Sequence, residues 1–397
     1  MKRTIALVLA LLLLTACGGG GNLPGGTAPE PPSGGEASLP EASGSESEAP
    51  EEPPAAAEIA LPLQPFADVR AIPGQEQRFA PGDFSPEHLM TFTFNQGTVF
   101  SGSEAQAMRI LDDAKNPGLG VRGLHRQGIT GKGVNVAIID QHLLLNHPEF
   151  TGKIADYHDT GCDTPESSGS MHAPAVTSLL VGESIGTAPG ARVYYAAVPS
   201  WLRDSKYYAD ALHWVVEQNR LLPADEKIRV VSISAAPSGM GSPFEKNHEL
   251  YDEAVALAQS EGILVLDCRE DDHTGFIAAA YYDPQDPENV KAVTSGWPMW
   301  DPVSLPFDLL AVPCSYRTVA EQYTTDTPSY QYNGQGGLSW AIPYAAGVLA
   351  LGWQLNLQLG GDEMARLLQS SSFFNRHGSR IIDPPAFIEA VKATLEA

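Results

Sequence analysis

The chain has 397 residues, of which 43% are hydrophobic, and it carries 48 acidic against 24 basic side chains, a formal net charge of −24. This length allows one large globular domain or two smaller ones. The acidic excess argues against a nucleic-acid partner, because phosphate binding needs a basic surface. The only long apolar run lies at the extreme N-terminus, which excludes a protein that crosses a membrane several times.

The N-terminus has the pattern of an export signal. A short basic segment, Met1-Lys2-Arg3, precedes an apolar core, Ile5 to Ala16, that is too short for a stable membrane span. The core ends in Leu-Thr-Ala before Cys17, and small residues before a cysteine resemble a bacterial lipobox, in which that cysteine is acylated. The alternative is an ordinary secretory signal that happens to contain a cysteine. We predict that residues 1–17 are a lipoprotein signal peptide and that Cys17 anchors the exported protein to the membrane, with its folded part on the extracytoplasmic side.

Residues 18–57 consist mainly of Gly, Pro, Ser, Glu and Ala, with almost no large apolar side chains. Such a segment cannot bury enough surface to offset its ordering entropy, so we predict a disordered linker that acts as a tether. Eight Glu lie between residues 18 and 60, which leaves 22 basic and 40 acidic residues from residue 61 onward. We interpret this remaining charge as a solvated acidic surface on a monomer.

From about residue 105 to residue 397, apolar runs of strand length alternate with helical stretches. Such continuous apolar strands, separated by helices, predict an α/β fold with a doubly wound, mostly parallel sheet flanked by helices in three layers. Chemistry in such folds collects beyond the carboxyl ends of the strands. The predicted strands are Val134–Asp140, Arg192–Val198, Ile228–Ser234, Ile263–Cys268, Val290–Thr294 and Leu309–Pro313, and the clearest helices are Tyr207–Asn219 and Phe244–Glu261.

Beyond the lipobox, three cysteines remain: Cys162, Cys268 and Cys314. An odd number permits at most one disulfide among them, and their spacing forms no metal-binding motif. Because Cys268 and Cys314 each end an apolar run, we expect small buried side chains. No metal and no cofactor is predicted.

Three polar residues stand where chemistry is expected. Asp140 ends the first strand, His172 precedes an apolar stretch of helical character, and Ser339 opens another long apolar stretch. Taken singly, each has a structural explanation as a turn or cap residue.

Their flanking segments are more specific. GITGKGVNVAIIDQHLLLNHPEF (128–150), MHAPAVTSLLVG (171–182), GTAPGARVYYAAV (186–198) and GGLSWAIPYAAGVLAL (336–351) resemble, in order, the catalytic segments of subtilisin-like serine peptidases. The resemblance covers roughly residues 110–360. It implies a subtilisin-like fold and an Asp-His-Ser triad of Asp140, His172 and Ser339, in which His172 takes the proton of the attacking Ser339 hydroxyl and Asp140 orients the imidazole. It also implies that Ser234, Ala235 and Ala236 form the edge that binds an extended peptide by strand pairing.

The chain departs from the family pattern at several positions. Ala173-Pro174-Ala175 replace Gly-Thr-His after the catalytic histidine, and Leu338 and Trp340 flank the nucleophile. Asp271 falls where the family has an asparagine that donates to the oxyanion. An ionised carboxylate there would repel the oxyanion, and loss of one such donor typically costs about 10²–10³ in turnover.

Two further family features are expected to be missing. Only Gly182–Ile185 separate the helix after His172 from the segment Gly186-Thr187-Ala188-Pro189-Gly190, so we expect the calcium-binding insertion of many relatives to be absent. Residues 58–104, an N-terminal extension, are shorter than the family's propeptide and show no convincing helix–strand pattern, so we predict no autonomous propeptide there.

Two functions remain. The first is a serine endopeptidase that cleaves proteins outside the cytoplasm, which the complete triad favours. The second is a catalytically weak or inert lipoprotein that binds extended peptides in the same groove, which Asp271 favours. An α/β-hydrolase esterase is excluded by residue order, because the acid and the histidine of that fold follow the serine, and the chain after Ser339 holds a single histidine, His377.

Overall fold

The computed structural model describes most of the chain after residue 62. The described residues are 63–72, 74–82, 84–165, 168–269, 276–295, 305 and 309–396. The predicted signal peptide with Cys17, the predicted linker and Asp271 lie outside the described residues.

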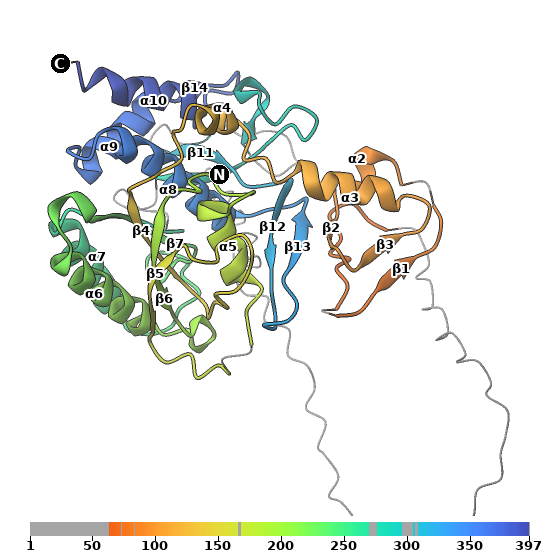
Figure 1. Ribbon diagram of the computed structural model, residues 1–397, viewed down its shortest axis with the longest axis horizontal. Coiled ribbons are helices and arrows are strands. Elements are labelled where there is room, and N and C mark those ends of the chain that lie inside the picture. The colour runs from red at the N-terminus through yellow and green to blue at the C-terminus, as the bar shows by residue number, and fades with distance from the viewer. Residues whose placement is uncertain are drawn as a thin grey trace, which may run out of the picture.

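A five-stranded parallel sheet forms the centre of the molecule (Figure 1). Helices cover both of its faces: α6 (Lys206–Leu221) and α7 (His248–Ser260) lie on one face, and α5 (His172–Val181) and α8 (Leu338–Leu355) lie on the other. The predicted three-layer α/β fold is therefore confirmed. In spatial order its strands are β5 (Ile154–Asp159), β6 (Arg192–Ala197), β4 (Asn135–Asp140), β7 (Ile228–Ile233) and β8 (Leu264–Leu266).

Strand β4 shows why the predicted strands are apolar throughout. Alternate side chains of a strand point to opposite faces of the sheet. Val136 and Ile138 join the core under α5 and α8, whereas Ala137 and Ile139 join the core under α6 and α7. Because both faces are buried, all six residues of the strand are buried and no polar alternation appears.

A second sheet continues the fold toward the C-terminus. Strand β11 is parallel to both β9 and β15, while β10 and β14 pair antiparallel at the two edges. Helices α9 (Gly361–Ser370) and α10 (Pro384–Ala393) pack against α8. In spatial order the strands are β10 (Thr294–Ser295), β9 (Ile277–Tyr281), β11 (Leu310–Pro313), β15 (Arg380–Ile381) and β14 (Phe373–Phe374).

The N-terminal extension has regular structure that the sequence does not reveal, and the absence of an autonomous propeptide stays a prediction. It contains β1 (Gln77–Phe79), α2 (Pro86–Leu89), β2 (Thr93–Asn95) and β3 (Thr98–Phe100), and α3 (Glu104–Asp113) follows. Phe79, Phe84, Phe92, Phe94 and Phe100 form an aromatic cluster that also includes Tyr332 of the body. These strands are only three residues long, which is too short for a periodic pattern to be visible in the sequence.

The extension is joined to the body through a three-stranded antiparallel sheet. Strand β2 pairs with β13 (Ser329–Asn333), and β13 pairs with β12 (Arg317–Glu321). In Figure 1 this sheet lies between the small N-terminal part and α5. The extension is thus attached to the strand that runs directly into the loop before Ser339.

Some predicted strands need correction. Val290–Thr294 is mostly a 3₁₀ turn, Val290–Ala292, followed by the short edge strand β10. Strands β5 and β9 were not predicted. Strand β5 is a half-exposed edge strand of sequence IADYHD, and β9 is rich in alanine, so neither has the apolar run that marks the others. Among the described residues, no helix is long and apolar enough to span a membrane.

Candidate active site

Asp140 and His172 are in direct contact. Asp140 is the last residue of β4 and His172 is the first residue of α5. The two carboxylate oxygens of Asp140 lie 2.9 and 3.0 Å from Nδ1 of His172. Because an ionised carboxylate can only accept, the proton of a neutral imidazole lies on Nδ1 and donates to Asp140. This leaves Nε2 with the lone pair that a general base needs.

The pair is withdrawn from solvent. The side chain of His172 is 16% exposed and that of Asp140 is 5% exposed. Burial by itself lowers the pKa of His172, but the charge of Asp140 and its hydrogen bond outweigh burial and raise that pKa above its ordinary value. The protonated form of His172 is therefore stabilised by the same carboxylate that orients the ring.

Ser339 is the second residue of α8, and a proline later in that helix changes the hydrogen bonding of its carbonyl group. Pro343 has no N–H, so the carbonyl of Ser339 loses the donor four residues ahead. The hydroxyl of Ser234, just after β7, donates to this carbonyl at 2.8 Å. In return, the Ser339 hydroxyl donates to the Ser234 carbonyl at 3.2 Å. Two reciprocal hydrogen bonds thus hold the start of α8 at the carboxyl end of the central sheet.

The loop before Ser339 is fixed by close backbone contacts. Gly336 has φ of +70°, and a Cβ at this position would come within 2.0 Å of the Cys314 carbonyl oxygen, so only glycine fits. The Asn333 side-chain oxygen accepts the N–H groups of Gln335 at 3.1 Å and Gly336 at 2.7 Å.

Helix packing brings His172 and Ser339 to one place. Helices α5 and α8 pack against each other. Trp340, next to Ser339, contacts the imidazole of His172 with a centroid distance of 5.4 Å and an interplanar angle of 61°. Asp140, at the end of β4, and His172, at the start of α5, are thus in contact, and Trp340 links the imidazole to the start of α8.

Comparison with known proteins places this arrangement in a family. The subtilase family model matches residues 131–384. The chain belongs to the subtilase family. Serine protease AprX of Bacillus subtilis (strain 168) is 26% identical to this subtilase over 295 residues, which cover 62% of each protein. Subtilisin NAT of Bacillus subtilis subsp. natto is 24% identical over 240 residues, which cover 57% of each. The chain thus spans about three fifths of the length of these relatives.

Two solved structures resemble this subtilase in fold. Fervidolysin from Fervidobacterium pennivorans, a keratinolytic enzyme related to subtilisin, gives a TM-score of 0.50 at 16% identity, over 68% of this chain and 44% of that one. A subtilase cytotoxin gives a TM-score of 0.52 at 14% identity, over 70% of this chain and 96% of the other. At such identities the likeness shows the fold alone.

The predicted peptide-binding edge of this subtilase begins beside Ser339. Ser234 is buried and its hydroxyl is directed at Ser339. The carbonyl of Ala235 accepts the N–H of Cys268 at 2.9 Å, and that of Ala236 accepts the Ser242 hydroxyl at 2.7 Å. The binding of peptide by Ser234, Ala235 and Ala236 stays a prediction, as does an oxyanion role of Asp271.

The loop after α5 in this subtilase is held by arginines. Its carbonyl oxygens at Ser184 and Ile185 accept hydrogen bonds from Arg122 and from Arg317, the latter at 3.0 Å. Across the part of the chain that the structure describes, no group of three or more His, Cys, Asp or Glu could hold a metal ion.

Cys162 and Cys314 are free thiols. Cys162 and Cys314 are buried, and burial raises the pKa of each thiol to about 12. The expectation of a small buried side chain is confirmed for Cys314, whereas Cys268 is only half-buried.

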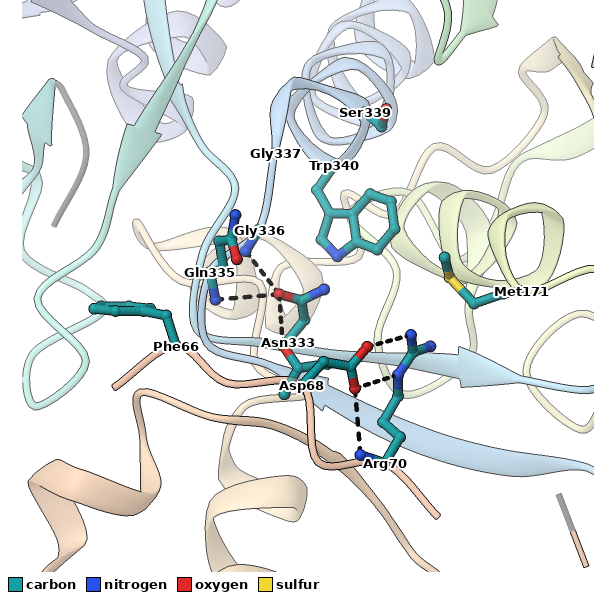
Figure 2. Close-up of a pocket in the computed structure, with 11 residues that line it drawn as sticks. Phe66, Asp68, Arg70, Met171, Asn333, Gln335, Gly336, Gly337, Ser339 and Trp340 are labelled. Carbon is teal, nitrogen blue, oxygen red and sulfur yellow. Dashed lines mark hydrogen bonds and ion pairs between the residues drawn. The ribbon is translucent and has the colours of Figure 1, made fainter. Parts of the chain in front are cut away.

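One part of the site was not predicted. A pocket of about 220 Å³ beside Ser339 is lined from two distant parts of the chain (Figure 2). Phe66, Asp68 and Arg70 come from the N-terminal extension, while Asn333 and Trp340 belong to the body. No local sequence pattern predicts that these two segments line one pocket, because their proximity depends on the pairing of β2 with β13.

Proposed function

We propose that this subtilase is a serine endopeptidase that hydrolyses peptide bonds of proteins outside the cytoplasm. The observation that carries the proposal is the double contact between Asp140 and His172 Nδ1 at 2.9 and 3.0 Å, beside α8, whose first turn holds Ser339. A carboxylate–imidazole pair of this geometry has the form of a general base beside a hydroxyl nucleophile.

Each triad residue then has one task. The Ser339 oxygen attacks the carbonyl carbon of the scissile bond while its proton passes to Nε2 of His172. The imidazolium gives this proton to the leaving amine, which departs and leaves an acyl group on Ser339. A water molecule attacks that ester, with His172 again accepting and returning a proton, and the acid product is released. Asp140 holds the ring and its charge throughout but does not itself become protonated.

The position of Ser339 also supports oxyanion stabilisation. N–H groups in the first turn of a helix have no partner within the helix and form the positive end of its dipole. Ser339 lies in the first turn of α8, an 18-residue helix. A negative oxygen that develops beside Ser339 is favoured there.

Labelling with a fluorophosphonate probe tests the proposal directly. The probe forms a stable adduct only with an activated serine, so we expect one adduct per chain, on Ser339, and none on Ser339→Ala. A folded wild-type protein that forms no adduct would contradict the peptidase and support the inert peptide-binding protein.

We also propose that Cys17 is acylated after export and that the catalytic domain is held outside the cell membrane by residues 18–57. The basic, apolar and Leu-Thr-Ala-Cys segments support this proposal. Mass spectrometry of the N-terminal peptide of the membrane-bound protein should show a diacylglyceryl group on Cys17.

A further inference from the structure

The pocket beside Ser339 is separate from the predicted peptide-binding edge. None of Ser234, Ala235 and Ala236 lines it. It lies instead on the side of the imidazole, because Met171, the residue before His172, and Trp340, which contacts the ring, are among its walls. Since His172 delivers a proton to the leaving amine, the substrate residue that follows the scissile bond lies on this side.

Trp340 contributes a hydrogen-bond donor without an acceptor. The residue is 6% exposed, and its Nε1 has no hydrogen-bond partner among the described residues. Figure 2 shows the indole extending from the start of α8 into the pocket, with the nitrogen on the side of Asn333. A buried donor without an acceptor is unfavourable, so a ligand that brings an acceptor is favoured.

Asn333 contributes a second donor of known orientation. Its Oδ1 already accepts the backbone N–H groups of Gln335 and Gly336 and the hydroxyl of Thr93 at 3.3 Å. These three bonds fix which side of the amide carries the oxygen. The Nδ2 group therefore faces the other way, toward the indole in Figure 2.

Arg70 brings a cation from the N-terminal extension. Its Nε and Nη2 donate to Asp68 at 2.9 and 2.6 Å, and its Nη1 donates to Gln331 at 2.7 Å. A guanidinium has five N–H groups, so these bonds leave two of them for a ligand. Arg70 donates three hydrogen bonds to Asp68, two from its side chain and one from its backbone N–H, so the carboxylate positions the guanidinium.

The size of the pocket suits one side chain. Its 220 Å³ is larger than the ~150 Å³ cavity that takes a benzene molecule and smaller than the ~300 Å³ or more of typical small-molecule sites. Phe66, Met171 and the Trp340 ring offer apolar walls to the stem of such a side chain.

We propose that this pocket, completed by Phe66, Asp68 and Arg70, binds the side chain that follows the scissile bond and selects one that ends in an acceptor oxygen, glutamine or glutamate. This inference rests on the proposed peptidase function. The N-terminal extension is then a part of the substrate site that determines specificity.

Binding to the full-length Ser339→Ala variant tests the pocket without catalysis. The ligands are four amidated peptides of sequence Xaa-Ala-Ala-Ala with a free N-terminus, in which Xaa is Gln, Glu, Met or Leu, and ligand-observed NMR measures their affinities. We expect the Gln and Glu peptides to bind about tenfold more tightly than the near-isosteric Met peptide. Equal affinities would overturn the proposal, and the ratio of Gln to Glu tells whether an amide or a carboxylate is preferred.

Second substitutions in that variant identify the donors. Trp340→Phe removes the N–H but keeps a ring, so the preference for Gln over Met should fall to about twofold or less. Asn333→Asp keeps the oxygen that accepts from Gln335 and Gly336 but replaces the donor with a negative oxygen, so Glu should bind more weakly than Met. If both variants kept the wild-type preference for Gln and Glu over Met, the proposal would be overturned.

A matched pair of arginines tests the role of the extension. Arg70→Met should reduce the preference for Glu over Met severalfold. Arg78→Met is the control, because Arg78 pairs with Glu76 two residues earlier, as Arg70 pairs with Asp68, but does not line the pocket. If the two substitutions had identical effects on the preference for Glu, the extension would have no part in the binding site.

Cleavage by the wild-type protein separates this inference from the proposed function. In a proteome-derived peptide library, residues that follow the cut should be enriched in Gln and Glu about tenfold over Met. Cleavage with no such enrichment contradicts the pocket and leaves the peptidase intact. Selective binding by Ser339→Ala with no cleavage by the wild type contradicts the peptidase alone.

Discussion

At the scale of single residues, the site depends on two polar pairs. Asp140 orients His172, the proposed base, and Ser234 holds Ser339, the proposed nucleophile. The first pair could be predicted from the sequence, because its flanking segments resemble those of a family. The second pair depends on Pro343, whose missing N–H frees a carbonyl that a residue 105 positions away satisfies.

Asp140→Asn should reduce kcat by about 10⁴, since the amide can stabilise the wrong tautomer of His172. The pH profile gives a second readout. Catalysis needs neutral His172, and Asp140 raises the pKa of that group, so wild-type kcat/KM rises through a pKa above the ordinary 6.5. Without the carboxylate that pKa falls, so the acid limb should move to lower pH. An unchanged acid limb would show that Asp140 does not control His172.

Ser234→Ala should lower the free energy of unfolding by about 1–2 kcal/mol, because the Ser339 carbonyl loses its donor. Pro343→Ala restores an N–H four residues ahead of that carbonyl. In the Pro343→Ala background the cost of Ser234→Ala should therefore shrink by about 1 kcal/mol, which urea denaturation of all four proteins measures. Strictly additive effects would refute the link between the proline and the serine pair.

At the scale of elements, the structures of the N-terminal extension and of the loop after α5 could not be predicted from the sequence. Both are stabilised by contacts between segments far apart in the chain, such as β2 with β13 and Arg317 with Ile185. The central strands, in contrast, are visible in the sequence because burial on both faces gives each one a continuous apolar run.

Phe100→Ala should destabilise the extension by about 3–5 kcal/mol. The Phe100 ring lies 5.0 to 5.9 Å from those of Phe79, Phe84, Phe92 and Phe94, so truncation leaves a cavity among them. Hydrogen exchange should show faster exchange in β2 and in its partner β13. The control is Met108→Ala, at a side chain that is 48% exposed, with an expected effect within about 0.5 kcal/mol.

Chelation by EDTA should leave the unfolding temperature unchanged, because the loop carbonyls at Ser184 and Ile185 are already bound by guanidinium groups. Arg317→Met should instead lower the stability by about 1–3 kcal/mol, since a buried carbonyl loses its donor. Arg109→Met, at an exposed position, is the control. A large EDTA effect on the folded protein would reveal a metal requirement.

At the scale of the whole molecule, the net charge and the predicted linker bear on the proposal that the enzyme is exported and anchored to a membrane. The net charge of −24 favours solubility and disfavours adsorption to anionic surfaces, so attachment to a membrane must come from elsewhere. The lipidated Cys17 is the proposed source.

Cys17→Ser should move the protein from the membrane to the soluble fraction of fractionated cells, because an acyl chain on this residue supplies the apolar contact. Peptidase activity per molecule should change less than twofold, since the catalytic residues lie more than a hundred positions away. Continued membrane attachment of the variant would point to another anchor.

The sequence by itself determined the layered α/β fold and the family, because apolar strands and short motifs are local patterns that burial and backbone geometry impose. It also singled out Asp140, His172 and Ser339. The tertiary structure alone decided the pairing of Ser234 with Ser339, the arginine-bound loop and the pocket that Arg70 shares with Trp340. The physical reason is that each of these depends on contacts between residues distant in sequence, which leave no periodic trace along the chain.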